Sequence, residues 1–218
     1  MTLADLETES RVLDLGALAR ATLARDPFDF LVVPFFVPPG AAAAARLCFP
    51  LSPHGGIAPA HAAEPGDGFD RLLRAVREPA FTSAMADKFG VRLDPRTLML
   101  TVRSRCRPQD GAIHADSTDK VVTALIYLNE SWPHTGGMLR ILRRNDDIDA
   151  MVAEVPPLDG TLLAFHRTDR SFHGHLPYDG VRRALMLNWM TDVGAARRET
   201  LRHAISATAK RIKSVVGA

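Results

Sequence analysis

The sequence is poor in cysteine: only Cys48 and Cys106 occur among its 218 residues, and they lie far apart along the chain. A scaffold held together by disulfides needs more cysteines, so we expect a protein of a reducing compartment, the cytoplasm. Long apolar runs are missing too, because prolines and a glycine break the longest one, FLVVPFFVPPGAAAAARL, and we expect no membrane-spanning segment. The first residues, MTLADLETESR, carry three acidic side chains and no apolar core, so they do not resemble a secretory signal.

A strong excess of charge of either sign is also absent. Lysine and arginine number 27 and aspartate and glutamate 25, which gives a formal net charge of +2. The basic residues are dispersed, and acids follow them directly in stretches such as RRNDDID. Only the tail RRETLRHAISATAKRIK is locally basic, as expected of a solvated helix face. We therefore expect no nucleic-acid partner.

Apolar residues are abundant, at 46% of the chain, which is enough for the core of one large domain. We predict a single domain over residues 1–218, built in three parts. Residues 1–95 form a mainly helical front, with a helix break near Pro79. Residues 96–192 form a β-rich core, and residues 193–218 form a C-terminal helix.

The core prediction depends on short β-rich runs that glycine, proline, asparagine and aspartate separate. These runs are TLMLTVRSRC, KVVTALIYLN, GGMLRIL, GTLLAF, SFHGHL and RRALMLNWM. So many strands without intervening helices predict a sandwich, jelly roll or barrel. With helices packed against one face of the sheet, the fold class is α+β.

Candidate metal ligands occur at two places in this core. In GAIHADSTDK, His114 and Asp116 are two residues apart, so on an extended strand their side chains share a face. His173, in a later β-rich run, supplies a second imidazole. Two histidines and one carboxylate form the facial arrangement that holds non-haem Fe(II) and leaves coordination positions open. The same donors also bind zinc.

Two adjacent arginines follow His173 in the run RRALMLNWM. On a strand, Arg183 shares a face with Leu185, Leu187 and Trp189. If that face is internal, a buried guanidinium needs a fixed anion, and a dicarboxylate suits its planar fork. The alternative is an outward Arg183 that pairs with Asp179 or Asp192.

The ordered set of a His-x-Asp pair, a distant histidine and an arginine ten residues further on resembles the 2-oxoglutarate- and Fe(II)-dependent dioxygenases. The phrases VVTALIYLNESW, GGMLRIL, GTLLAF and HGHLP…RRALMLNW are closest to the prolyl-hydroxylase-like branch. The resemblance covers roughly residues 96–192. It implies a double-stranded β-helix (jelly-roll) core, Fe(II) held by His114, Asp116 and His173, 2-oxoglutarate as co-substrate, and dioxygen, with ascorbate as a supporting reductant.

The resemblance also implies a 2-oxoglutarate pocket. Arg183 would bind the distal carboxylate, and Tyr127 would assist it. Leu139 would form an apolar wall, and Trp189 would close the pocket near the arginine. Arg182 is a rival for Arg183, but the tryptophan six residues further on favours Arg183.

The sequence departs from the prolyl hydroxylases upstream of His114. Where that branch has a tyrosine, this chain offers Arg103 and Arg105, and Arg105 would serve the site by facing an anionic substrate. His175 is either a substrate contact or a structural histidine. The segment 117–120 is a candidate lid. The other histidines are expected on the surface or in loops: His54, His61, His134, His166 and His203.

The resemblance implies hydroxylation of an unactivated C–H bond of an amino acid, a peptidyl (prolyl-type) residue or a small metabolite, with release of succinate and CO2. Halogenating members replace the ligating carboxylate by a small residue, whereas Asp116 is retained here. Two other readings compete: a cupin-type metal-binding jelly roll, either an isomerase or a non-catalytic binder, and a purely structural β domain. Neither gives Arg183 and Tyr127 a role.

Overall fold

The computed structural model describes residues 11–52 and 55–202. The helices are α2 (Leu15–Arg20), α3 (Pro39–Leu47), α4 (Gly68–Arg77), α5 (Pro79–Phe89), the short 3-10 helices η1 (Pro95–Thr97) and η2 (Pro108–Gly111), and a helical segment over 193–202. The strands are β1 (Phe30–Val33), β2 (Ala58–Pro59), β3 (Leu98–Cys106), β4 (Lys120–Tyr127), β5 (Leu139–Leu142), β6 (Met151–Val155), β7 (Leu162–His166), β8 (His173–Gly174) and β9 (Gly180–Met190).

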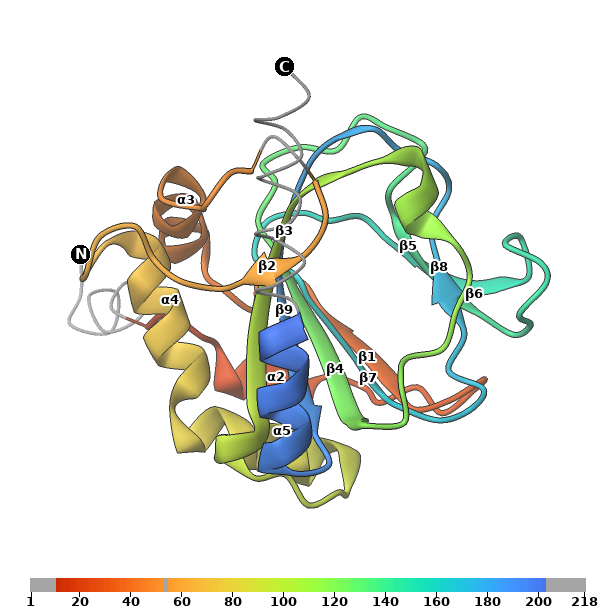
Figure 1. Ribbon diagram of the computed structural model, residues 1–218, viewed down its shortest axis with the longest axis horizontal. Helices are drawn as coiled ribbons and strands as arrows, with labels where there is room; N and C mark the ends of the chain where they lie inside the picture. The colour runs from red at the N-terminus through yellow and green to blue at the C-terminus, as the bar shows by residue number, and fades with distance from the viewer. Residues whose placement is uncertain (1–10, 53–54, 203–218) are drawn as a thin grey trace.

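The strands form two sheets. The large sheet has the order β1-β7-β4-β9-β3-β2, and the small sheet has the order β6-β5-β8. All the paired strands are antiparallel. In Figure 1, α3 and α4 lie on one side of the large sheet and the small sheet lies on the other. This mixed helical and antiparallel architecture agrees with the predicted fold class and is consistent with a jelly-roll core.

The helical front also contributes to the sheet. Strand β1 pairs with β7 at one edge, and β2 pairs with β3 at the other. The predicted break near Pro79 is confirmed. Helix α4 ends at Arg77 with Glu78 as its C-cap, and Pro79 is the first residue of α5. At that position the missing N–H of proline costs no helical hydrogen bond. Of the predicted C-terminal helix, residues 193–202 are helical, and the remainder lies outside the described residues.

Both faces of the large sheet are buried, and the two-residue period of its strands separates two apolar clusters. On β4, Val122, Ala124 and Ile126 pack toward the helices, within the larger cluster. Leu125 and Tyr127, which alternate with them, pack against the small sheet. The space between the two sheets is therefore where an internal site can form. None of the helices in the described part of the chain combines the length and the hydropathy that a membrane crossing requires.

Candidate metal centre

His114, Asp116 and His173 come together in space, as their pattern in the sequence predicts. Their potential ligand atoms all lie within 4.8 Å of one another. His114 lies between η2 and β4, and His173 begins β8. The backbones of these two histidines form an isolated antiparallel bridge, with each amide nitrogen 3.0 Å from the other residue's carbonyl oxygen. Backbone pairing thus fixes the spacing of the two imidazoles.

The two histidine rings are oriented by backbone carbonyls. His114 Nδ1 lies 2.9 Å from the Ala112 carbonyl oxygen, and His173 Nδ1 lies 3.0 Å from that of Ser171. Because a carbonyl only accepts, each Nδ1 carries the proton and leaves Nε2 free to bind a metal. Burial lowers the pKa of His173 to about 4, so its imidazole is neutral and ready to coordinate at pH 7.

The Asp116 carboxylate is held on both of its oxygens and is only 9% exposed. Lys120 Nζ donates to Oδ1 at 2.8 Å, and Thr123 Oγ1 donates to Oδ2 at 2.5 Å. Thr123 Oγ1 also lies 3.0 Å from the Asn188 side-chain amide on β9. Burial raises the pKa of Asp116, but the Lys120 charge and these hydrogen bonds outweigh it and lower the pKa to about 2. The carboxylate is therefore ionised and fixed in orientation.

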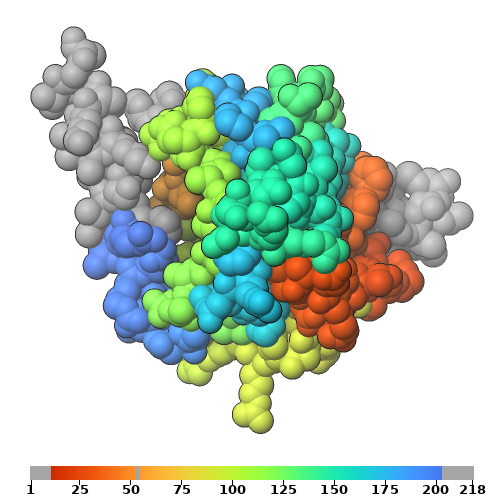
Figure 2. Space-filling view, turned by 90° about the vertical axis from the view of Figure 1, so that its right-hand side faces the viewer, coloured from red at the N-terminus to blue at the C-terminus, as the bar shows by residue number. Residues whose placement is uncertain are grey.

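The three side chains open onto a cavity of about 200 Å³ between the sheets. Leu139 of β5 lines it, as predicted, and so do Met186 and Asn188 of β9. Figure 2 faces the small-sheet side, with the β5–β6 hairpin (residues 139–155, teal) at the centre and the helical segment 193–202 (blue) near the edge. The cavity thus adjoins the candidate metal site and has one apolar wall.

Arg182 places a buried cation in this cavity. Arg182 is only 3% exposed. Nε donates to the Gly137 carbonyl oxygen at 2.7 Å, and Nη2 donates to Tyr127 Oη at 3.2 Å. No carboxylate of the described residues forms an ion pair with it. A buried guanidinium without a counter-ion is costly, so an anion that entered the cavity beside Arg182 would be stabilised there.

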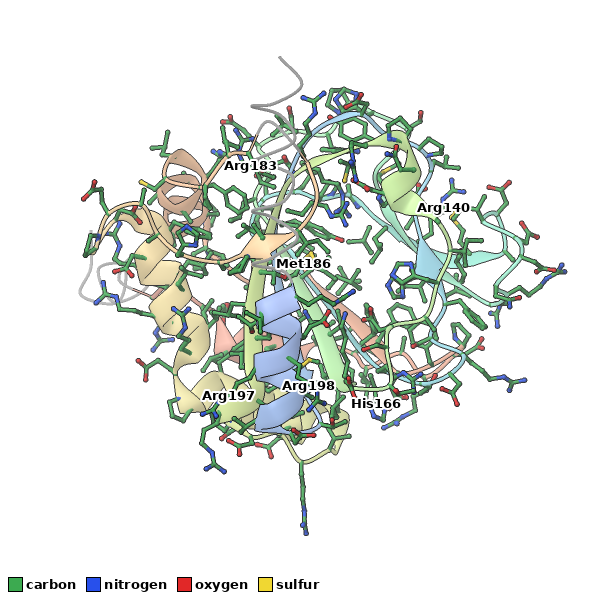
Figure 3. All side chains as sticks on the ribbon, viewed as in Figure 1. Arg140, His166, Arg183, Met186, Arg197 and Arg198 are labelled. Atoms are coloured by element: carbon green, nitrogen blue, oxygen red, sulfur yellow. The ribbon has the colours of Figure 1, made fainter. Side chains whose placement is uncertain are left out.

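The prediction that Arg183 faces the interior is wrong, because the strand register is shifted by one residue from the one assumed. Arg182 points into the cavity, and Arg183 points to the helical side, where Arg46 lies close enough to lower its pKa further after burial has done so. Figure 3 shows Arg183 toward α3, apart from Met186. Within the described residues, Arg183 pairs with neither Asp179 nor Asp192. A one-residue shift in a strand exchanges its two faces.

The predicted position of Trp189 is wrong for the same reason. Trp189 is fully buried on the helical side, with its ring centroid 5.6 Å from that of Phe81 of α5. Its Nε1 donates to Thr82 Oγ1 at 3.2 Å. Asn188 takes the place in the cavity that Trp189 was expected to fill. Tyr127 is not among the residues that line the cavity, but its hydroxyl accepts a hydrogen bond from Arg182, which does line it.

The two candidate arginines upstream of His114 also divide between the faces. Arg103 lines the cavity, whereas Arg105 pairs with Asp179 at 2.7 Å in an exposed ion pair. The suggestion that Arg105 serves the site is therefore wrong, since of these two arginines only Arg103 lines the cavity. His175 lines the cavity as well, and burial followed by the charge of Arg182 lowers its pKa to about 4.

None of the remaining histidines of the described residues lines the cavity, and of the candidate lid only Lys120 does. His61 and His134 are exposed, and His166 ends β7 partly buried. His54 and His203 lie outside the described residues. In the segment 117–120, the first three residues are exposed and Lys120 begins β4.

Three side chains of the site were missed by the sequence analysis: Lys120, Thr123 and Asn188. Thr123 and Asn188 did carry a signal, since each is a polar residue inside an otherwise apolar strand that is buried on both faces. Such a residue must find a polar partner. Lys120 offered no comparable signal, because a lysine at the start of a strand is ordinarily solvated.

Comparison with known proteins agrees with this geometry. Residues 103–191 match the family model of the 2OG-Fe(II) oxygenase superfamily. A prolyl-4-hydroxylase of Pseudomonas putida has a TM-score of 0.57 at 20% identity, covering 81% of this chain and 96% of that one. An oxidoreductase of the 2OG-Fe(II) oxygenase family from Burkholderia pseudomallei has a TM-score of 0.56 at 15% identity, covering 84% and 93%.

A third solved structure is a prolyl hydroxylase of Trichoplax adhaerens in complex with a peptide fragment of hypoxia inducible factor. It has a TM-score of 0.52 at 17% identity, covering 90% of this chain and 96% of that one. At these identities the three structures show a shared fold. No curated protein sequence matches the chain.

Proposed function

We infer that this chain, which carries a domain of the 2OG-Fe(II) oxygenase superfamily over residues 103–191, hydroxylates an unactivated C–H bond of an amino acid, a peptidyl residue or a small metabolite. Succinate and CO2 are the co-products from 2-oxoglutarate. The core is accordingly a double-stranded β-helix. The observation that carries this proposal is the buried Arg182 without a carboxylate partner, in the same cavity as His114, Asp116 and His173.

The three grouped side chains suit Fe(II). Two neutral imidazoles and one ionised carboxylate are its usual facial donors, and they leave open positions for a chelating co-substrate and dioxygen. Bound Fe(II), with 2-oxoglutarate and dioxygen, supplies the oxidising power for the reaction. The protein's share is to orient His114 and His173 through their Nδ1–H groups, and Asp116 through Lys120 and Thr123.

Arg182 and Tyr127 would hold the distal carboxylate of 2-oxoglutarate. The Gly137 carbonyl fixes the Arg182 guanidinium at Nε, which leaves its other donors for a bidentate carboxylate contact. Tyr127 Oη accepts from Arg182, so its own hydrogen is free to donate to the same carboxylate. Leu139 supplies the apolar wall beside the co-substrate's methylene groups. A cupin-type metal binder would leave Arg182 without a ligand.

A thermal-shift measurement tests this assignment. At about a hundred times its dissociation constant, a ligand adds about 2.7 kcal/mol to folding stability, and each kcal/mol raises the melting temperature by about 2–4 °C in a domain of this size. Mn(II), a redox-stable substitute for Fe(II), should therefore let 2-oxoglutarate raise the melting temperature by several degrees. Succinate, which lacks the keto oxygen, should do much less.

Two controls accompany the thermal shift. Asp116→Ala should lose most of the 2-oxoglutarate effect, because its metal site is weakened. Fe(II)-dependent formation of succinate from 2-oxoglutarate, followed by NMR, should run in parallel. A full 2-oxoglutarate shift in the presence of a metal chelator, or an equal shift with succinate, would contradict the assignment.

The turn at Gly137 should control how well Arg182 is placed. Gly137 has a φ of 78°, and a Cβ there would lie 2.7 Å from the Trp132 ring and 3.1 Å from Tyr178. Gly137→Ala should therefore shift the carbonyl that holds Arg182 and raise the KM for 2-oxoglutarate several-fold. Gly90→Ala is the matched control, since Gly90 also has a positive φ (66°) but no atom within 4 Å of a new Cβ. Gly90→Ala should lose about 1 kcal/mol of stability from backbone strain, and Gly137→Ala should lose more, because the Trp132 ring must also shift. An equal KM in the two would exclude the positioning role.

A further inference from the structure

One wall of the cavity is formed by residues of β3 that have no role in the proposed function. Met99, Thr101 and Arg103 alternate along β3 and all line the cavity. Thr101 and Arg103 lie opposite Met186 and Ala184 of β9. Neither side chain contacts the metal ligands or Arg182 through any hydrogen bond or ion pair in the described structure. This wall therefore faces the part of the cavity that is left for a substrate.

Arg103 carries positive charge that its neighbours only partly neutralise. Its Nη1 lies 2.8 Å from Asp110 Oδ2, with the two side chains 15% and 10% exposed. The same carboxylate also accepts from the Arg107 backbone nitrogen at 3.0 Å and pairs with Arg107 Nη2 at 3.3 Å. One carboxylate is thus shared by two guanidinium groups, and one positive charge is in excess beside the cavity.

Thr101, on the same face of β3 as Arg103, has a side-chain hydroxyl without a hydrogen-bond partner in the described structure. The residue is 1% exposed. A buried hydroxyl without a partner costs about 1–3 kcal/mol, and a valine would fill the same space without that cost. The hydroxyl is placed to bond to something that enters the cavity.

The other charges that line the cavity favour an anion in this region. When Asp116 is assigned to the metal and Arg182 to 2-oxoglutarate, the remaining cations are Arg103, Lys120 and Arg202. The remaining carboxylates are Asp110 and Glu199. Glu199 is paired with Arg202. Around Arg103 itself, the two guanidinium groups of Arg103 and Arg107 and the one Asp110 carboxylate leave a single positive charge, which matches a monoanion better than a dianionic phosphate.

We propose that the substrate carries a carboxylate, and that Arg103 and Thr101 bind it. Arg103 supplies the charge and Thr101 Oγ1 donates a hydrogen bond, while His175, neutral on the same cavity, adds no competing charge. The proposal rests on the proposed function, because it assumes that Arg182 is occupied by 2-oxoglutarate. The cavity of about 200 Å³ must also hold the metal and 2-oxoglutarate, so only a small acid, or one end of a larger one, enters.

Matched acids and amides test this substrate class. The probes are N-acetyl-L-amino acids and the corresponding N-acetyl-L-amino-acid amides, titrated by calorimetry into protein saturated with Mn(II) and 2-oxoglutarate. At least one acid should bind ten or more times more tightly than its amide, because the charge-assisted contact is lost in the amide. Arg103→Gln should abolish that preference. Arg105→Gln, the matched control on the same strand with an exposed partner, should keep it.

Asp110→Asn separates this role from a purely structural one. Freeing Arg103 from its shared carboxylate should tighten binding of the acid several-fold, whereas a structural ion pair would give unchanged or weaker binding. Three results would overturn the proposal: amides that bind as tightly as acids, an acid preference that survives Arg103→Gln, or no acid of the panel that binds at millimolar concentration.

The same protein preparations also test the proposed function, independently of the substrate class. The Mn(II)-dependent thermal shift by 2-oxoglutarate, and its conversion to succinate with Fe(II), should be measured in the unaltered protein and in Arg105→Gln, and both signals should be intact in these two proteins. Loss of both signals in the unaltered protein would refute the oxygenase assignment, whereas intact signals without an acid preference would refute only the substrate class.

Discussion

His173→Ala is expected to abolish Fe(II) binding and the conversion of 2-oxoglutarate to succinate, with the fold retained. His173 is buried beside Asp116, and its Nε2 is the only ring nitrogen left for a metal once Nδ1 has donated to the Ser171 carbonyl. If the three side chains are the protein ligands, removing one leaves too few donors to retain the ion at the metal concentrations used for assay. His114→Ala should behave in the same way.

The measurement combines iron content, far-UV circular dichroism and succinate formation on the same preparations. His166→Ala is the control, since it removes an imidazole at the end of β7 that does not line the cavity. That variant should keep its iron and its turnover. Normal iron content in His173→Ala would remove this residue from the metal site, and loss of the dichroism signal would mean that its role is in folding.

Arg182→Lys should weaken 2-oxoglutarate binding by about ten- to a hundredfold, and Arg183→Lys should have little effect. Lysine keeps the charge of Arg182 but loses the planar fork that grips a carboxylate with two hydrogen bonds. Loss of one charge-assisted hydrogen bond costs about 1.5–3 kcal/mol, which corresponds to that range of affinities. Arg183 points to the helical side, so its substitution does not reach the cavity.

The KM for 2-oxoglutarate, the Kd in the presence of Mn(II), and the iron content should be measured for both variants. Because Arg182 does not contact the three candidate ligands, metal binding should be unchanged in Arg182→Lys. A larger effect from Arg183→Lys would show that the register of β9 in solution differs from the one described. Reduced iron content in Arg182→Lys would assign this arginine to the metal site and not to the co-substrate.

The grouping of His114, Asp116 and His173 could be predicted because donor type and spacing are written in the sequence. A strand places residues two apart on one face, and few other chemistries need two imidazoles and a carboxylate in this order. Their role as ligands stays a prediction. The succession of short β-rich runs separated by turn residues, with helices before and after them, was likewise enough for the α+β class.

The face of β9 could not be predicted from hydrophobicity, because both of its faces are buried. Leu185, Leu187 and Trp189 form the more apolar face, and in this fold that face packs on helices. The face with Arg182 and Asn188 is the more polar one, and it lines the site. When both faces of a strand are covered, the polar residues, rather than the large apolar ones, indicate which face lines a cavity.

The surroundings of Asp116 were beyond prediction for a different reason. Lys120 and Thr123 are ordinary residues of a strand until the fold brings the carboxylate to them, and Thr123 is in turn placed by Asn188 from a distant part of the chain. The same applies to Thr101, whose hydroxyl is unusual only because nothing in the described structure bonds to it. Roles of this kind arise from three-dimensional neighbours, not from local pattern.

The backbone bridge between His114 and His173 would give a metal ion bound at this site a structural role. His173 belongs to the small sheet, while Asp116 is anchored through Thr123 and Asn188 to the large one. An ion held by all three side chains is a cross-link between the two layers, and it closes the long stretch of chain between them. Loss of such an ion would leave the two layers less firmly joined and the seam between them more readily opened to proteases.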